Sequence, residues 1–493
     1  MVLSSATMRA FTAGIDAIGA RKPSESIPVA NSRSGLVVRC CREKAPFGGN
    51  DQITRSHLGS QWDRYRCLCD LSGFVCARKS VRRHVAALGA GRDGGTIPQP
   101  SSGVKSSMNS RGRRPSVVTM RVGIFSECYH PIANGVVASI DALCEGLRAA
   151  GHDAVVVAPA ARSTEVAPSV CLPSLPLPTR TAYRLVLPVL GARKRAHVRS
   201  FSVIHTHSPF VTGWMGVRYA RLFGLPLVFT YHTQLEEYAH YVPFERTATK
   251  RAASTLTRTY ANLADAVIVP TVPMEDRLRA LGVTSPIAVV PTGINVDQFR
   301  GGRRDAAWRS ALGVGPGERV VLLVSRLARE KNIELAFAGL AALGDPGAHL
   351  VLAGDGPARS ALVAAAKAAG MLDRTHFLGH VPREALPGVY ASADAFLFPS
   401  RTETQGLVLA EALIAGLPVV AVDTPATRDV LGDAGHLVPP DPRALATALR
   451  GVLDAHRGRQ SAAPLALSRF SLEAQARKVV DVYETLLAER RTA

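Results

Sequence analysis

The sequence lacks several patterns that are typical of common protein classes. It has no run of about 20 consecutive apolar residues, so no segment is expected to span a membrane. It has neither the Gly-x-Gly-x-x-Gly fingerprint nor a Walker loop, so dinucleotide binding and P-loop hydrolysis lose support. No His-x₃₋₅-His pair follows the five cysteines that lie close together, which argues against a zinc site. These five are Cys40, Cys41, Cys67, Cys69 and Cys76, and the others, Cys128, Cys144 and Cys171, are scattered as reduced cytosolic thiols would be.

The composition is that of a globular protein. Of the 493 residues, 47% are hydrophobic and only 20% are charged, which predicts large cores in two or three domains. The formal net charge is +20, but residues 1–119 alone carry 19 Lys and Arg against 7 Asp and Glu. Most of the excess charge therefore lies outside the regular part of the chain. Because no aromatic-stacking or recognition-helix motif accompanies it, we expect no nucleic-acid partner.

Residues 1–119 are rich in Ser, Arg and Gly and show no sustained periodicity, which predicts a poorly ordered basic extension. Two explanations are open. An organelle transit peptide has a similar composition, and a start codon assigned too far upstream would also add such a segment. We favour the second, because Met120 directly precedes a typical first strand of an α/β domain.

From residue 121 onward, strand-like runs alternate with helical patterns, which predicts mostly parallel, doubly wound sheets. The first series of strands comprises Val122–Ser126, Ala154–Ala158, Val203–His207, Leu227–Tyr231, Ala266–Pro270 and Ile287–Pro291, with helices at 136–150 and 246–263. After a glycine-rich linker over 295–317, the second series comprises Arg319–Ser325, Leu350–Gly354, His376–Gly379, Ala395–Pro399, Pro418–Val422 and His436–Pro439.

We therefore expect two Rossmann-like domains, at 120–300 and 301–471, that face a central cleft. The cleft is the default ligand site. A last helix over 472–493 is expected to return to the N-terminal domain.

Two acids, Glu403 and Glu411, lie eight positions apart in one stretch of the second domain. Glu403 follows the predicted strand Ala395–Pro399, and Glu411 lies in a predicted helix over Leu407–Ala415. In an open α/β sheet, ligands bind at the carboxyl ends of the strands, where a helix start also offers free N–H groups to an anion. If the stretch were helical, about 12 Å of axial rise would separate the acids. This is too far for the two carboxylates of a glycosidase, which lie roughly 5–10 Å apart. The spacing is better explained if the two acids have different roles at different parts of one extended ligand.

Other candidate residues follow predicted strands. Gly135 precedes a helix, where it would let a phosphate approach backbone N–H groups, although an ordinary turn glycine is an equally good explanation. Arg326 and Lys331 follow the first strand of the second domain and could neutralise a diphosphate, whereas most basic loops are merely solvated. His232 follows a strand of the first domain, and a lone histidine is more often structural than catalytic. The pair His205-x-His207 has no evident third ligand, so no metal is expected.

The segment from Leu175 to Arg199 combines apolar bulk with cations. Such a segment suits an anionic membrane surface. A buried helix with a solvated basic face, interrupted by Pro188, explains the pattern equally well. The candidate membrane contacts are Arg180, Arg184, Arg193, Lys194 and Arg195.

Taken together, the residues from about 120 to 490 resemble the family 4 retaining glycosyltransferases of the GT-B fold. The resemblance rests mainly on Glu403 and Glu411 in the pattern Glu-x₇-Glu. It implies that Glu403 faces the donor sugar, that Glu411 binds the ribose, and that Arg326 and Lys331 hold the diphosphate. It further implies that Gly135, Gly406 and Leu407 belong to the donor site and that His232 approaches the reacting centre.

One departure from the family pattern is informative. Many members read Glu-Gly-Phe-Gly, whereas this chain has Glu403-Thr-Gln-Gly406. This variant resembles the subgroup that acts on lipids, such as diacylglycerol glucosyl- and sulfoquinovosyltransferases and GDP-mannose-dependent mannosyltransferases.

The resemblance implies a hexosyltransferase that uses a UDP- or GDP-hexose, without a cofactor or metal, and acts on a membrane lipid or lipid-linked acceptor. It would lie in the cytoplasm, peripherally at the inner face of the cell membrane. The alternatives are the same chemistry on a soluble acceptor, or a non-catalytic protein that binds nucleotide sugars or nucleic acid.

Overall fold

The computed structural model describes residues 119–160, 166–177, 183–237, 245–455 and 464–492. All of them belong to one compact unit by their contacts. Residues 1–118 of the predicted basic extension, with its five cysteines, and Arg180 lie outside the described residues. Within the described part, the chain forms two parallel sheets, each covered by helices on both faces.

The N-terminal sheet has the strand order β3-β2-β1-β6-β7-β8-β9, and all of its described pairs are parallel. Its strands are β1 (Arg121–Phe125), β2 (Asp153–Pro159), β3 (Val170–Leu172), β6 (Val203–Thr206), β7 (Leu227–Thr230), β8 (Ala266–Val269) and β9 (Ile287–Val289). The six predicted strands are confirmed to within two residues at each end, because each is a short run with strong β propensity and all but the half-buried β9 are largely buried. The short edge strand β3 was not predicted. The order reverses between β1 and β6, which is where ligands bind in sheets of this type.

The C-terminal sheet has the order β12-β11-β10-β13-β14-β15 and is also parallel. Its strands are β10 (Arg319–Val324), β11 (Ala348–Ala353), β12 (Thr375–Gly379), β13 (Ala395–Phe398), β14 (Val419–Val422) and β15 (Gly435–Val438). All six were predicted. Here the order reverses between β10 and β13, so the loops after these two strands define the ligand-binding edge.

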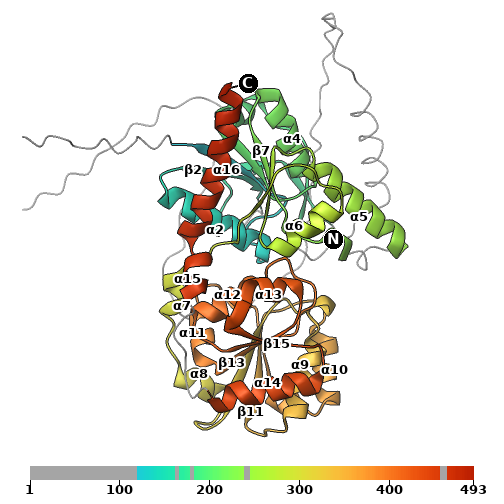
Figure 1. The fold of residues 1–493 in the computed structure, drawn as a ribbon, viewed down its shortest axis with the longest axis vertical. Helices are drawn as coiled ribbons and strands as arrows, with labels where there is room; N and C mark the ends of the chain where they lie inside the picture. The colour runs from blue at the N-terminus through green and yellow to red at the C-terminus, as the bar shows by residue number, and fades with distance from the viewer. Residues whose placement is uncertain (1–118, 161–165, 178–182, 238–244, 456–463, 493) are drawn as a thin grey trace, which may run out of the picture. The chain divides into compact units, whose positions relative to one another are not determined.

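Helices cover both faces of each sheet (Figure 1). On the N-terminal sheet, α2 (Gly135–Ala149) and α16 (Leu472–Thr492) cover one face, and α4 (Val211–Phe223), α5 (Arg246–Ala261) and α6 (Val272–Ala280) cover the other. On the C-terminal sheet, α9 (Ile333–Leu343), α10 (Arg359–Ala368) and α14 (Pro442–Ala455) cover one face. Its other face packs against α7 (Val296–Arg300), α11 (Leu386–Ser392), α12 (Leu407–Ile414), α13 (Pro425–Leu431) and α15 (Pro464–Arg469).

The last helix, α16, packs against α2 and completes the core of the N-terminal domain. Val479, Tyr483 and Leu486 belong to the same buried cluster as β1 and α2. The two helices approach closely at Gly146, where a Cβ atom would lie only 2.8 Å from the carbonyl oxygen of Leu472. A side chain at Gly146 would therefore push the helices apart.

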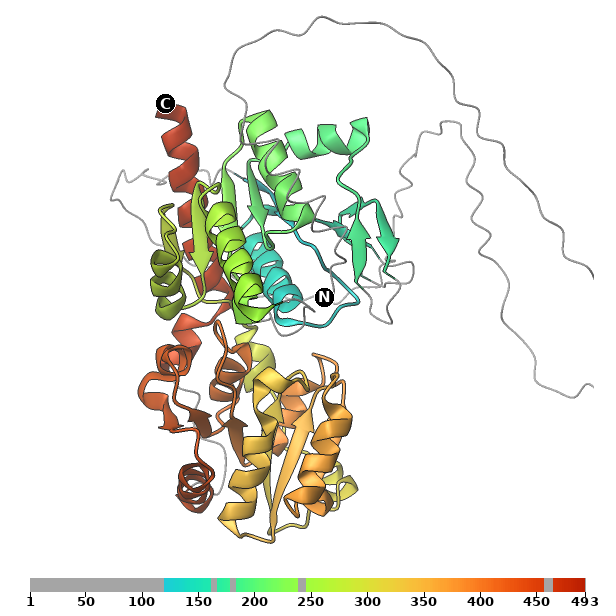
Figure 2. The same ribbon diagram turned by 90° about the vertical axis from the view of Figure 1, so that its right-hand side faces the viewer.

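A small antiparallel ribbon was not predicted. It pairs β4 (Ser174–Pro176) with β5 (Arg184–Val186) and leads to α3 (Ala192–Arg199). Figure 2 shows the ribbon and α3 at one side of the N-terminal sheet. The ribbon is short, rich in proline and largely exposed, so it has neither the length nor the buried alternation by which strands are recognised.

The predicted linker over 295–317 instead contains two short helices, α7 and α8 (Ala306–Ala311). Each is stabilised by a side-chain cap: Asn295 accepts a hydrogen bond from the N–H of Gln298 at 3.1 Å, and Asp305 from that of Trp308 at 3.0 Å. These helices were not predicted, because the glycines between them dominate the composition of the segment and the capping residues are single positions within it.

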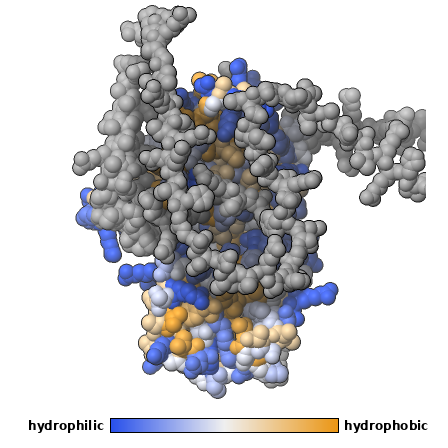
Figure 3. Space-filling model, turned by 180° about the vertical axis from the view of Figure 1, so that it is seen from behind, coloured by the Kyte–Doolittle hydropathy of each residue, from blue (hydrophilic) through white to orange (hydrophobic). Residues whose placement is uncertain are grey.

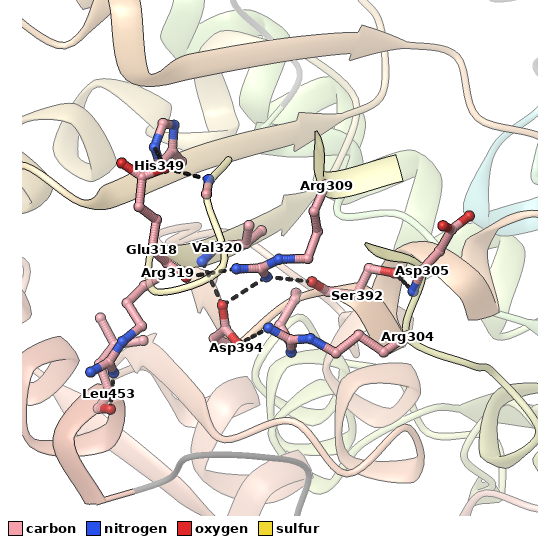
Figure 4. A network of polar contacts seen from close by, with 12 residues as sticks. Arg304, Asp305, Arg309, Glu318, Arg319, Val320, His349, Ser392, Asp394 and Leu453 are labelled. Atoms are coloured by element: carbon pink, nitrogen blue, oxygen red, sulfur yellow. Dashed lines mark hydrogen bonds and ion pairs between the residues drawn. The ribbon is translucent and has the colours of Figure 1, made fainter. Parts of the chain in front are cut away.

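The linker is tied to the C-terminal sheet by a network of polar contacts around Arg309, which is 5% exposed (Figure 4). Arg309 Nη1 lies 2.9 Å from Asp394 Oδ2 and also donates to the carbonyl of Ser392, while Nη2 donates to the carbonyl of Glu318. Asp394 in turn accepts from the N–H of Val320 at 2.7 Å. The network lies at the amino ends of β10 and β13, the edge opposite the one where a ligand is expected.

The exposed surface differs between the two domains. On the face drawn in Figure 3, hydrophobic and hydrophilic residues are interspersed over the C-terminal domain. The large hydrophobic side chains that are exposed in the described part of the chain all lie in the N-terminal domain: Val166, Leu175, Leu185, Val189, Leu222 and Val272. None of the described helices is both long and apolar enough to cross a bilayer.

Candidate active site

Glu403 lies on the loop between β13 and α12, at the ligand-binding edge of the C-terminal sheet. It forms an ion pair with Lys331, which ends the 3₁₀ helix η2 (Arg329–Lys331) after β10. Ser400 Oγ donates a second hydrogen bond to the Glu403 carboxylate at 3.2 Å. The side chains of Lys331 and Glu403 are 18% and 17% exposed, so the pair is reachable from the cleft. Two residues that were assigned to different parts of one ligand thus lie in direct contact.

Glu411 lies deeper, on α12, and is 2% exposed. Its Oε1 atom pairs with Arg383 Nη1 at 3.2 Å, and its Oε2 atom accepts from the hydroxyl of Tyr390 at 2.9 Å. Burial raises the pKa of Glu411, and the charge of Arg383 opposes this rise. Neither Arg383 nor Tyr390 was predicted as a partner of Glu411. Only the rule that a buried acid needs a partner could have prompted a search for them.

Gly406 and Leu407 form the junction between the acid loop and α12. Gly406 has φ = 73°, which glycine adopts without strain, and a Cβ atom there would lie 3.2 Å from the ring of Phe398. Leu407 is the first residue of α12. The N–H of Leu409 donates to the carbonyl of Gly406 at 2.9 Å, whereas the N–H groups at the very start of the helix have no partners within it and are suited to bind an anion.

The loop after β1 brings a second helix start to the ligand-binding edge of the N-terminal sheet. Asn134 caps α2 by accepting from the N–H of Val137 at 2.9 Å, and a Cβ atom built on Gly135 meets nothing within 4 Å. Asn134 Nδ2 also donates to the hydroxyl of Tyr183 at 3.2 Å. Burial raises the pKa of Tyr183, and the positive charge of the exposed Arg326 opposes this rise.

Three histidines form a row at the carboxyl ends of β6 and β7, and we call His205, His207 and His232 the histidine row. The ring centroids are 4.4 Å apart between His205 and His207 and 5.0 Å apart between His207 and His232. Burial lowers the pKa of His205 to about 3 and that of His232 to about 4, and it lowers the pKa of His207 well below the usual range. The row is therefore neutral at pH 7. Among the described residues, no group of three or more His, Cys, Asp or Glu side chains is arranged to hold a metal ion.

His232 and Glu403 line the same pocket. The other lining residues also come from both domains: Thr233, Gln234 and Glu237 from the N-terminal domain, and Glu330, Thr402 and Thr404 from the C-terminal domain. Gln234 Nε2 donates to the carbonyl of Glu403 at 3.0 Å, and Thr404 Oγ1 donates to that of His232 at 3.0 Å. The loop that departs from the common family pattern thus makes direct hydrogen bonds to the N-terminal domain. Gln405 adds another, accepting from the N–H of Thr292 at 2.9 Å.

The predicted membrane contacts fall into two groups. Arg184 is held within the β4–β5 ribbon, where its Nε donates to Ser174 Oγ at 2.8 Å. Arg193, Lys194 and Arg195 are all exposed on α3, in which only Val198 is buried. The alternative of a buried helix with a solvated basic face does not describe α3, because most of the helix is exposed, and the predicted membrane contact stays a prediction.

The sequence model of Glycosyltransferase Family 4 matches residues 133–298, and that of Glycosyl transferases group 1 matches residues 305–464. The alpha-monoglucosyldiacylglycerol synthase of Acholeplasma laidlawii is 33% identical over 317 residues, which cover 61% of this chain and 80% of that protein. The chain belongs to glycosyltransferase family 4. This result confirms the predicted family and enzyme class.

Further relatives of this glycosyltransferase are consistent with that assignment. The GDP-mannose-dependent alpha-(1-6)-phosphatidylinositol dimannoside mannosyltransferase of Mycobacterium tuberculosis is 31% identical over 69% of this chain and 90% of that protein. The crystal structure of HepE from Anabaena in complex with UDP-glucose has a TM-score of 0.60 at 19% identity, and the match covers 74% of this chain and 100% of that chain. Together with the two parallel sheets, this likeness confirms the predicted GT-B fold.

Proposed function

We propose that this glycosyltransferase moves glucose or mannose from a nucleotide diphosphate donor to a membrane lipid or lipid-linked acceptor, with retention at the anomeric carbon. The observation that carries the proposal is the ion pair of Lys331 with Glu403, which lines the same pocket as His232. A cation and a carboxylate side by side suit the point where a diphosphate meets a sugar rich in hydroxyl groups. The names of the relatives, a glucosyldiacylglycerol synthase and a phosphatidylinositol dimannoside mannosyltransferase, support a hexose and a lipid.

On the donor side, Lys331 and Arg326 would neutralise the diphosphate, and the N–H groups at Gly135, Gly406 and Leu407 would bind its oxygens. Glu403 would hold hydroxyl groups of the sugar. We assign the donor to the C-terminal domain, because the loops after β10 and β13 carry most of these groups, and the acceptor to the N-terminal domain.

Glu411 would bind the ribose hydroxyls, which requires a change at its present contacts. Both of its carboxylate oxygens already have partners within the protein. Tyr390 is fully buried, whereas the side chain of Arg383 is 38% exposed. Arg383 is therefore the partner that can give way when a ribose enters.

The chemistry we propose is attack by an acceptor hydroxyl from the same face as the leaving group. A bond forms between the acceptor oxygen and C1 of the sugar while the bond from C1 to the phosphate oxygen breaks. The acceptor proton passes to the departing phosphate. Neither acid of the Glu-x₇-Glu pattern is arranged as the free nucleophile that double displacement requires, because Glu403 is paired with Lys331 and Glu411 is buried with Arg383.

We further propose that the enzyme lies peripherally at the cytoplasmic face of the cell membrane and contacts anionic lipids through α3. The cations Arg193, Lys194 and Arg195 are exposed there, and Leu175 and Val189, on the segment that leads to α3, are 52% and 60% exposed. Each cation near an anionic surface contributes about 1 kcal/mol of binding free energy. Neutralising all three should weaken binding to anionic vesicles by about 3 kcal/mol, or roughly 100-fold.

The experiment is an activity assay of the full chain with UDP-glucose, UDP-galactose and GDP-mannose against a bacterial lipid extract. Glu403→Ala should mainly lower kcat, and Glu411→Ala should mainly weaken donor binding. The reverse pattern would refute the two assignments. Flotation with anionic vesicles tests the lipid surface, and a wild-type protein that stays unbound while glycosylating a soluble acceptor would refute the lipid version.

A further inference from the structure

His207 is the buried centre of the histidine row and has no role in the proposed chemistry so far. It is 4% exposed, and its Nδ1 atom lies 2.7 Å from Nε2 of His232. The two rings are stacked with 18° between their planes. Because both rings are neutral, one of these two nitrogens carries a proton and donates it in a hydrogen bond, and the other nitrogen is the acceptor of that bond.

The surroundings of His207 decide which nitrogen is the donor. Its Nε2 atom is buried and has no hydrogen-bond partner within the described residues. If Nε2 carried the proton, a buried N–H group would be unsatisfied, which is rare and costly in proteins. If Nδ1 carries it, only a lone pair lacks a partner. The second arrangement is favoured, so Nδ1–H of His207 donates to Nε2 of His232.

This assignment fixes the state of His232. Since its Nε2 atom accepts a hydrogen bond, neutral His232 must carry its proton on Nδ1. The Nδ1 atom has no hydrogen-bond partner in the part of the chain that the structure describes, and His232 lines the pocket that contains Glu403. His232 thus has one N–H donor without a partner among the described residues, and its side chain lines the pocket in which the proposed function places the sugar.

We propose that His207 is a positioning residue for the transfer reaction: it sets the tautomer and ring orientation of His232, so that His232 presents Nδ1–H to the substrate. The inference rests on the proposed function, because His232 matters only if it meets the substrate. His205 provides the contrast within the row. Its Nδ1 bonds the hydroxyl of Tyr483 at 2.7 Å and its Nε2 bonds Thr230 Oγ1 at 2.6 Å, so both of its ring nitrogens are used inside the protein.

The first test is the tautomer of His232 in the full-length wild-type protein. With ¹⁵N-labelled histidine, two-bond ¹⁵N–¹H correlations distinguish Nδ1–H from Nε2–H rings, and His232→Ala identifies the signal among the 14 histidines. Nδ1–H on His232 at pH 7 supports the proposal, and Nε2–H overturns it. This measurement does not depend on activity, so it stands even if the proposed function fails.

The second test compares substitutions that keep or remove the donor. His207→Asn places an amide N–H near the position of Nδ1, whereas His207→Leu keeps the volume but has no donor. By analogy with partners that orient metal-bound histidines, we expect His207→Leu to lower kcat by about 10- to 100-fold, with His207→Asn recovering most of the loss.

In a His232→Ala background, His207→Leu should have no further effect on kcat. Equal losses in folded His207→Asn and His207→Leu proteins, or a loss that persists without His232, would overturn the positioning role. Full activity of His232→Ala alone would instead refute the assigned role of His232 in the proposed function. His205→Gln is the control: it should lower stability without changing the tautomer of His232.

Discussion

Lys331→Met separates a functional role of the Lys331–Glu403 pair from a structural one. The two side chains are 18% and 17% exposed, so the pair lies between a surface ion pair and a buried one. Losing it should cost about 1–2 kcal/mol of folding free energy, between the values typical of these two classes. In the transition state, however, Lys331 would face the negative charge that develops on the departing diphosphate. Removing one such stabilising group typically lowers the rate by about 10²- to 10³-fold.

The assay measures kcat and KM for the donor that the enzyme prefers, together with a urea titration of the same preparations. Because charge on the leaving group grows in the transition state, kcat should fall more than KM rises. Lys367→Met is the matched control, since Lys367 is an exposed lysine in the last turn of α10. It should leave kcat unchanged and alter stability by less than about 1 kcal/mol.

Two results would refute the reasoning. A folded Lys331→Met protein that loses less than about threefold in kcat/KM would show that no diphosphate charge develops near this lysine. A loss of activity that is fully explained by the unfolded fraction in the urea titration would assign the pair a purely structural role.

Three further predictions concern stability. Arg309→Met should destabilise the C-terminal domain by about 3 kcal/mol, because it leaves Asp394 with the partly exposed Arg304 as its cationic partner. Urea unfolding measures the loss of stability, and kcat per folded molecule should not change. The histidine row should make the protein less stable below pH 6.5, because unfolded histidines take up protons that the folded row excludes down to pH values near 4. Each histidine of the row should lower the free energy of unfolding by up to about 1.4 kcal/mol per pH unit. Unfolding of the wild type and of His205→Gln between pH 7 and 4.5 tests this. Gly406→Ala should cost about 1–2 kcal/mol because of its φ of 73°, whereas Gly388→Ala, where a Cβ atom has open space, should be neutral or slightly stabilising in thermal unfolding.

The strands could be predicted because their signal is local. Buried runs such as Val203–Thr206 and Ala395–Phe398 are bounded by polar or turn residues and need no knowledge of the rest of the chain. The topology followed from the alternation of strands and helices. This alternation predicts that Arg326, Lys331 and Glu403 lie at one edge of the sheet.

The partners of the buried acid could not be predicted, because they depend on long-range packing. Arg383 and Tyr390 are 28 and 21 residues from Glu411, and no motif marks either of them. The link between His207 and His232 spans two neighbouring strands and became visible only once β6 and β7 were paired. The helices in the glycine-rich linker were missed because their capping contacts are specific, whereas composition is averaged over many residues.

The position of α16 has a consequence for how the chain folds during synthesis. The ribosome releases the N-terminal domain first, but the core around β1 and α2 lacks Val479, Tyr483 and Leu486 until the whole C-terminal domain has been made. The apolar face of the nascent N-terminal domain therefore stays uncovered until α16 has been synthesised. If the chain is cut between the two sheets, neither half is expected to be stable when it is expressed alone. A stable isolated N-terminal domain should require α16 to be grafted back onto it, for example by a linker in a permuted chain.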